Sequence, residues 1–224
     1  MVRAMLIAVL ITIGLQGNAQ TESRITRYNY FFLEAIRQQE MGNLAAAFDL
    51  LNHARDINPK APEVYYEIAG YYVAMQNSKA ARYNFEQAAK LAPDNSTYLE
   101  KLGQFYISQN NYEDALTTYE QLYTSNKTRE DVLQILYQLY GAQNNYKKMI
   151  EMIERMELLS GASEQLSLTK MQIYEQMGDK RKAQAELLRL VQKNPLELNY
   201  RVMLGNWLLQ NNKKKEAYNE YQTV

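Results

Sequence analysis

The chain has 224 residues, of which 46% are hydrophobic and 22% charged, so it can build a sizeable core and is not an intrinsically disordered chain. Lysine and arginine balance aspartate and glutamate at 25 each, and the basic footprint of a nucleic-acid-binding protein is therefore missing. The chain contains no cysteine, which excludes disulfides, thiolate nucleophiles and thiolate metal ligands.

Residues 1–19 have the pattern of a cleaved signal peptide. Arg3 is a minimal basic region, residues 4–15 form an apolar run, and residues 17–19 (Gly-Asn-Ala) supply the small side chains that a signal peptidase reads. The run is shorter than the about 20 residues that span a bilayer comfortably. An uncleaved anchor and a cytosolic chain remain as alternatives. Because no cysteine is available to carry lipid, we expect the mature chain to be soluble in the periplasm or outside the cell, without direct membrane insertion.

The rest of the chain follows a constant period. Pro59 and Pro93 are 34 residues apart, and Pro195 lies three such periods beyond Pro93. A frame set by these prolines leaves residues 20–27 as a short leader. It divides residues 28–224 into repeats that start at residues 28, 62, 96, 130, 164 and 198. Such a period predicts stacked copies of one supersecondary unit.

Each repeat has the pattern of two helices joined by a tight turn. One position of the second helix is small in five of six repeats, and it is occupied by Ala47, Ala81, Ala115, Met149, Ala183 and Ala217. A small side chain there lets paired helices approach closely. The predicted turns are Gly42-Asn43, Gln76-Asn77, Asn110-Asn111, Asn144-Asn145, Gly178-Asp179 and Asn211-Asn212. Gly, Asn and Asp tolerate the left-handed backbone that ends one helix and admits the next. These features predict an all-α fold.

The period, the small-residue position and the turns together resemble the tetratricopeptide-repeat (TPR) family over about residues 28–224. The chain is also similar to exported, tyrosine-rich bacterial members. The resemblance implies a helix-turn-helix solenoid, coiled as a right-handed superhelix, whose first helices line a concave groove. Repeats four and five depart from the family pattern, since Tyr137 and Met171 replace the small residue of the first helix. The last repeat stops within its second helix at Val224, so we expect the sequence to be part of a longer protein.

Residues for catalysis or cofactor binding are not grouped in any recognisable motif. His53 is the only histidine, whereas metal sites and nucleophilic triads generally need more than one such group. No glycine-rich phosphate-binding motif is present. We therefore expect no enzyme activity, no metal and no cofactor. Trp207 is expected to pack between repeats, and the run Lys213-Lys214-Lys215 to be a solvated helix face.

The resemblance also implies which side chains face the groove, namely those at the second, fifth, ninth, twelfth and thirteenth places of each repeat. The candidate peptide-binding residues are Asn29, Phe32, Glu63, Tyr66, Glu100, Gln104, Gln134, Gln138 and Gln172. None of the thirty positions so defined is lysine or arginine, and five are acidic. This argues against the basic clamp with which some family members hold a C-terminal carboxylate, because a carboxylate needs charge-assisted donors. A neutral or basic extended peptide fits better, unless these faces are merely polar and binding uses another surface.

The leading functional hypothesis is a non-catalytic scaffold that binds a protein or peptide partner in an exported compartment, and no nucleic acid. The alternative is the extracytoplasmic sensor or regulatory portion of a longer membrane signalling protein. A helper domain fused to an enzyme and an inert spacer are further possibilities. All of these rest on family analogy rather than on the chemistry of a site.

Overall fold

The computed structural model describes residues 22–224 of the chain, and every regular element in that range is a helix. Residues 22–40 are helical, so the helix that continues into the first repeat begins within the stretch that the repeat frame leaves as a short leader. The predicted signal peptide lies outside the described residues. The chain divides into two compact units, the first ending at Asn111 and the second comprising Tyr112–Val224.

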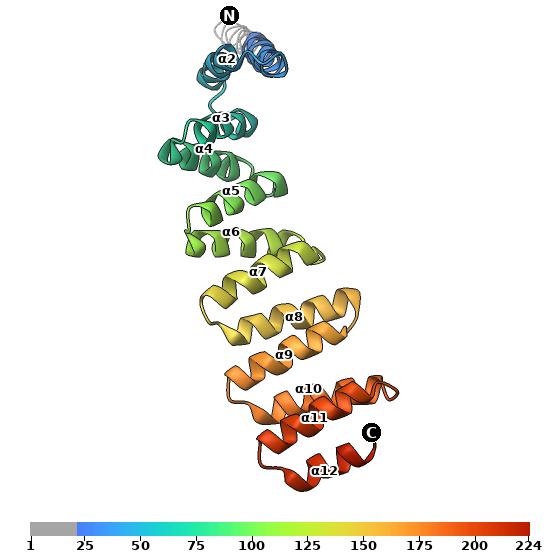
Figure 1. Ribbon diagram of the computed structural model, residues 1–224. Helices are drawn as coiled ribbons and strands as arrows, with labels where there is room; N and C mark the ends of the chain where they lie inside the picture. The colour runs from blue at the N-terminus through green and yellow to red at the C-terminus, as the bar shows by residue number, and fades with distance from the viewer. Residues whose placement is uncertain (1–21) are drawn as a thin grey trace, which may run out of the picture. The chain divides into compact units, whose positions relative to one another are not determined.

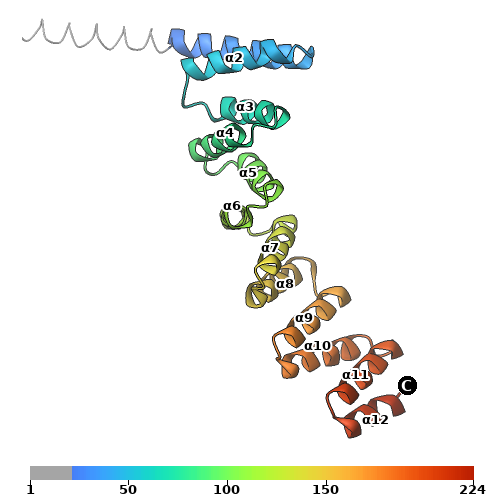
Figure 2. The ribbon, with the colours of Figure 1, turned by 60° about the vertical axis from the view of Figure 1, so that its left-hand side comes forward.

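The first unit contains residues 22–40 followed by α2 (Leu44–Ile57), α3 (Pro62–Ala74), α4 (Ser78–Leu91) and α5 (Ser96–Ser108). The second unit contains α6 (Tyr112–Ser125), α7 (Glu130–Ala142), α8 (Tyr146–Ser160), α9 (Glu164–Gln176), α10 (Lys180–Lys193), α11 (Leu198–Gln210) and α12 (Lys214–Gln222). Successive helices of each unit lie side by side in chain order (Figures 1 and 2). From α3 to α11 the first helices of the repeats each have 13 residues and begin 34 residues apart. The predicted all-α repeat solenoid is therefore confirmed.

The turn inside each repeat contains one residue with left-handed backbone. These residues are Gly42, Gln76, Asn110, Asn144, Gly178 and Asn212, each 34 positions after the last. In the final repeat the left-handed residue is the second of the predicted pair, whereas in the others it is the first. The next residue then caps the second helix in several repeats, as when the Asn77 side chain accepts a hydrogen bond from the Ala80 N–H. In each repeat, one left-handed residue thus ends the first helix and allows the second helix to begin.

The small-residue position of the second helices is buried, as the sequence predicts. The five alanines at this position expose 1% or less of their surface. Met149 replaces alanine in the fourth repeat, and its Cε lies 3.4 Å from the point where a Cβ on Gly141 would be. The missing side chain of Gly141 therefore makes room for the larger Met149. The Tyr221 ring packs closely against Gly205, where a Cβ would lie 2.5 Å from a ring carbon, so this position favours glycine.

Several of the 19 tyrosines join consecutive repeats through their hydroxyl groups. Tyr106 on α5 donates a hydrogen bond to Glu86 on α4, with 2.8 Å between the oxygens, and in the second unit Tyr140 on α7 donates to Glu120 on α6. Both tyrosines are buried, and burial, followed by the hydrogen bond to Glu120, raises the pKa of Tyr140. These tyrosines thus bury a ring while satisfying their polar group.

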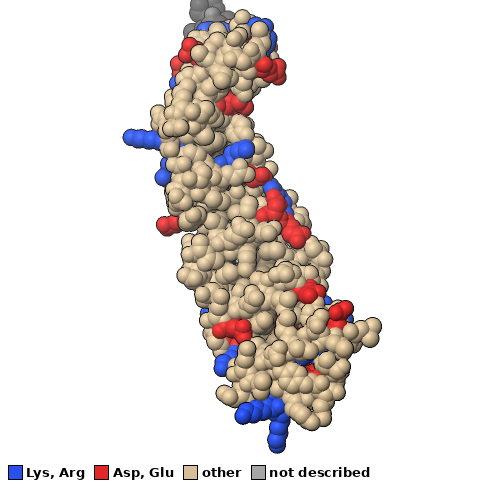
Figure 3. Space-filling model, viewed as in Figure 1, with Lys and Arg blue, Asp and Glu red and all other residues tan. Residues whose placement is uncertain are grey.

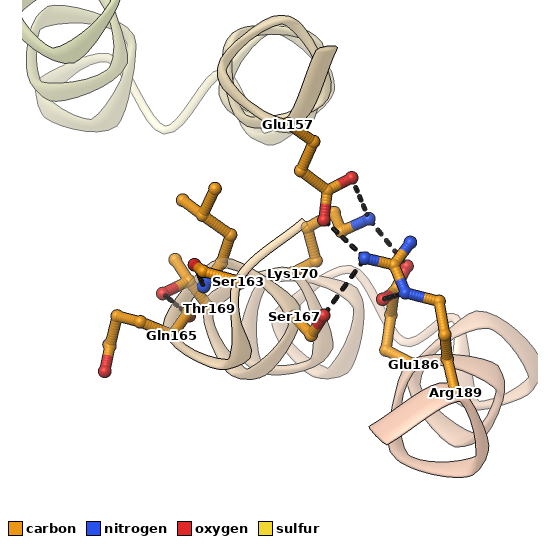
Figure 4. Close-up of polar contacts among 9 residues, drawn as sticks. Glu157, Ser163, Gln165, Ser167, Thr169, Lys170, Glu186 and Arg189 are labelled. Carbon is orange, nitrogen blue, oxygen red and sulfur yellow. Dashed lines mark hydrogen bonds and ion pairs between the residues drawn. The ribbon is translucent and has the colours of Figure 1, made fainter. Parts of the chain in front are cut away.

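A buried ionic cluster joins α8, α9 and α10 where repeats four and five depart from the pattern (Figure 4). Lys170 is only 3% exposed, and its Nζ lies 2.8 Å from a Glu157 oxygen and 2.9 Å from a Glu186 oxygen. Arg189 contacts the other Glu157 oxygen at 2.5 Å and also donates to the Ser167 hydroxyl. Burial by itself would raise the pKa of Glu157. The hydrogen bonds from Lys170 and Arg189 have the larger effect together, so the pKa of Glu157 lies below its ordinary value. The cluster therefore joins the second helix of repeat four to both helices of repeat five through charge pairing.

Candidate binding groove of the first unit

A hollow of about 440 Å³ lies between α3 and α5, the first helices of the second and third repeats, with α4 as its floor. Its lining residues are Tyr66, Glu67, Gly70, Val73, Phe85, Lys101, Gln104, Phe105 and Ser108. The surface is therefore an apolar floor with a polar rim, which is the composition of many ligand-binding sites.

Three aromatic side chains, those of Tyr66, Phe85 and Phe105, line this hollow. The Tyr66 ring lies 5.1 Å from the ring of Tyr98 and 6.3 Å from that of Phe85, measured between centroids. Phe85 in turn packs 5.4 Å from Phe105. Such offset and edge contacts hold the rings in fixed positions. The floor is thus a preformed surface for an apolar or aromatic side chain.

A second hollow of about 210 Å³ lies on the other side of α3, toward the first repeat. It is lined by Gln39, Leu44, Glu67, Gly70, Tyr71 and Ala74. Glu67 and Gly70 line both hollows. A Cβ built on Gly70 would meet no atom within 4 Å, so the two hollows are separated at this point only by the bare backbone of α3. We call the two hollows together the α3 groove.

Glu67 is the polar group common to both halves of the α3 groove. Burial raises the pKa of its carboxyl group above the ordinary value, and a hydrogen bond with Gln39 opposes this shift. The Tyr71 hydroxyl also donates to Gln39, at 3.2 Å. Glu67 forms no ion pair within residues 22–224, and the exposed Lys101 of α5 is the basic residue that lines the larger hollow. The groove therefore has an acidic centre and one basic rim.

The candidate residues predicted in the first unit are only partly brought together. Tyr66 and Gln104 line the larger hollow. Glu63 accepts a hydrogen bond from the Tyr28 hydroxyl, and Phe32 is half-buried and stacked on the Tyr28 ring at 5.9 Å. Both side chains thus contact Tyr28 of the first repeat and lie outside the lining of the α3 groove.

Two further candidates of this unit lie outside the lining of the α3 groove. Asn29 is exposed on the helix of residues 22–40. Glu100 is half-buried on α5, one turn before Gln104. Neither belongs to the set of residues around the two hollows.

The second unit has comparable hollows between its first helices. One of about 390 Å³ lies between α7 and α9 and includes Gln134, and one of about 420 Å³ lies between α9 and α11. Gln138 and Gln172 are exposed but line neither. Trp207 is buried as predicted, and its indole N–H donates to Glu175 at 2.5 Å. Only one of the three glutamines predicted in this unit therefore lies in a hollow.

The lining residues missed by sequence analysis occupy other places in the repeat. Glu67 and Lys101 stand at the sixth place and Phe105 at the tenth, next to the positions that the family pattern assigns to the groove. The signal that identifies them is their spacing of one helical turn from the predicted residues, because residues three and four apart share a helix face.

Several further features of residues 22–224 bear on the expectations from the sequence. Within residues 22–224 no group of three or more His, Asp or Glu side chains is arranged to hold a metal ion. His53 is exposed, and its ring packs edge-on against Phe31 at 4.2 Å. No helix in the described part of the chain has the length and apolarity needed to cross a membrane. Figure 3 shows Lys and Arg side chains over the α12 end of the second unit, where Lys214 and Lys215 are exposed.

Comparisons with known proteins agree with the repeat architecture. Residues 66–129 match a family model described as tetratricopeptide repeat. No curated protein sequence matches the chain. Among solved structures, a tetratricopeptide repeat protein from Parabacteroides merdae is similar, with 16% identity, coverage of 89% of this chain and 79% of that chain, and a TM-score of 0.56.

Two further solved structures share the fold. MamA from AMB-1 has 20% identity over 72% of this chain and 88% of its own, with a TM-score of 0.55. One chain of Naa15/Naa10 bound to HypK-THB has 15% identity and a TM-score of 0.65, covering 88% of this chain but 31% of that one. At these identities the structures support the fold alone. Residues 66–129 thus match the tetratricopeptide-repeat family by sequence, and the described repeats have the fold of tetratricopeptide-repeat proteins.

Proposed function

We propose that the protein is a non-catalytic scaffold that holds an extended segment of a partner protein in the α3 groove. The observation that carries this proposal is the pair of hollows that meet over Gly70, because together they form a path across α3 with an aromatic floor on one side. The larger hollow has the volume of a small ligand pocket and accommodates one apolar side chain. Gln104 and Ser108 at its rim offer hydrogen-bonding groups to a peptide backbone.

A selection from displayed random 12-residue peptides against the immobilised full chain tests this proposal. We expect enriched peptides to share an apolar or aromatic anchor. Gly70→Leu should weaken their binding at least tenfold, because the new side chain fills the junction of the two hollows. The helix should persist, since leucine favours a helix more than glycine does.

Ala46→Leu on α2 is the matched control. Ala46 is an exposed helical residue outside the groove, so this variant adds the same leucine elsewhere in the unit. Peptides that bind Gly70→Leu as tightly as the unmodified chain would refute the groove proposal. The same holds if the selection enriches no peptide over a surface without protein.

We further propose that the protein acts in an exported compartment. The support is the basic, apolar and small-residue order of residues 1–19. Expression of the full chain with a C-terminal tag, followed by fractionation and N-terminal sequencing, tests it. A mature chain that begins at Gln20 in the periplasm or medium is expected, and an intact N-terminus in the cytosol would contradict the proposal.

A further inference from the structure

The chemistry of the α3 groove narrows the kind of segment that it holds, an inference that rests on the proposed function. Glu67 is the only charged residue that lines both hollows. A chain that fills both must therefore pass over its carboxylate. The groove thus presents, in order, a small hollow with Leu44, a carboxylate, and a larger hollow floored by aromatic rings.

The surroundings of Glu67 leave its charge poorly compensated. The pKa of the Tyr66, Tyr71 and Tyr98 phenols is raised by burial and, for Tyr98, by the charge of Glu63, and the charge of Glu67 adds to this shift in all three. Gln39 is its hydrogen-bonding partner, and Glu67 forms no ion pair with any described residue. A half-buried carboxylate without a cation is costly, and an arriving cation relieves that cost.

The position of Lys101 restricts where that cation can lie. Lys101 is exposed on α5 and lines the larger hollow. A second cation placed deep in that hollow would be repelled, whereas one over α3 meets Glu67. Lys101 therefore favours an apolar side chain in the larger hollow, and Glu67 favours a positively charged group over α3.

We infer that the α3 groove recognises a protein segment in which a lysine or arginine stands between two apolar side chains, with the cationic group against Glu67. The expected ligand therefore has one apolar residue for each hollow and a basic residue between them.

The selection on the full chain is repeated against Glu67→Gln to test this inference. We expect peptides from the unmodified chain to carry Lys or Arg between two apolar residues, and peptides from Glu67→Gln to keep the apolar pair without the base. Asp49→Asn on α2 is the charge-matched control, because Asp49 is exposed and lies outside the groove. It should select the same peptides as the unmodified chain.

Four dissociation constants, measured for two peptides on two protein variants, make the test quantitative. Replacing the lysine of a selected peptide with norleucine should weaken binding to the unmodified chain about tenfold, and should change binding to Glu67→Gln less than twofold. If the basic residue stays enriched on Glu67→Gln, or the norleucine effect is equal on both chains, the inference is overturned. Sensitivity of the same peptides to Gly70→Leu would then still support the groove itself, so the two proposals fail separately.

Discussion

Replacing Lys170 with methionine should destabilise the second unit by about 3 kcal/mol at neutral pH, because removal of one partner from a buried ion pair usually costs about 3–5 kcal/mol. Methionine keeps most of the side-chain volume, so the loss is mainly electrostatic. The substitution leaves the carboxylates of Glu157 and Glu186, each 12% exposed, with Arg189 as their remaining cation. Arg189 contacts both carboxylates, at 2.5 Å and 3.6 Å, which places the expected cost at the lower end of the range.

The sole tryptophan provides the assay. Trp207 is buried in the core that α9, α10 and α11 share, so its fluorescence during urea unfolding reports on this unit. The double variant Lys170→Met/Glu157→Gln should recover part of the loss, because Glu186 and Arg189 then balance each other. Lys182→Met is the surface control, since Lys182 is 60% exposed in its pair with Asp179, and exposed pairs contribute about 1 kcal/mol or less.

The pH dependence gives a second readout. The pKa of Glu157 is lowered in the folded chain, so the stability that this group contributes is present above its unfolded pKa and is lost as pH falls through the folded pKa. The difference between the unmodified chain and Lys170→Met should therefore shrink as the pH is lowered from 7 to 3. A loss below about 1 kcal/mol at pH 7, or a difference that does not change with pH, would refute the reasoning.

Three further predictions concern single residues. Gly70→Ala should raise the free energy of unfolding by about 0.5–1 kcal/mol, because the position is inside a helix and the added methyl meets no atom. Gly205→Ala should not raise it, because the added methyl displaces the Tyr221 ring, and thermal unfolding of the two variants tests this difference. Glu67→Gln should stabilise the first unit at pH 7, because the pKa of Glu67 is raised in the folded chain. The unmodified chain therefore gains stability as the pH falls through the folded pKa of Glu67. Urea unfolding from pH 7 to 4 should show this gain in the unmodified chain and not in the variant. Gln76→Gly should stabilise by about 0.5–1 kcal/mol, because glutamine is held at a φ of 56° in the turn, and an unchanged or lower urea midpoint would contradict this.

The repeat fold could be predicted from the sequence because it depends on local signals. The buried alanines and the turn residues repeat in register, and each acts within its own helix pair. The turn of the last repeat was placed one residue early because both Asn211 and Asn212 suit it. The repeat frame predicts where the first repeat begins but not where its first helix begins, and that helix already includes residues 22–27.

The groove could be predicted only in part because its shape depends on contacts between repeats. Tyr66 and Gln104 were found through the family pattern, but the engagement of Glu63 by Tyr28 joins residues 35 positions apart and leaves no local sign. The burial of Glu67 likewise depends on the helices packed around α3. The ionic cluster of Lys170 could not be predicted either, because the partners of Lys170 come from two other helices.

The tyrosine–carboxylate bonds between consecutive repeats bear on how the array unfolds. Because Tyr106 and Tyr140 each find their acceptor on the preceding repeat, a repeat that loses this neighbour leaves a hydroxyl group to water. Stability in such arrays is carried largely by nearest-neighbour interfaces. We therefore expect fraying to spread inward from the ends, and amide hydrogen exchange to be slowest in helices that have a folded repeat on both sides.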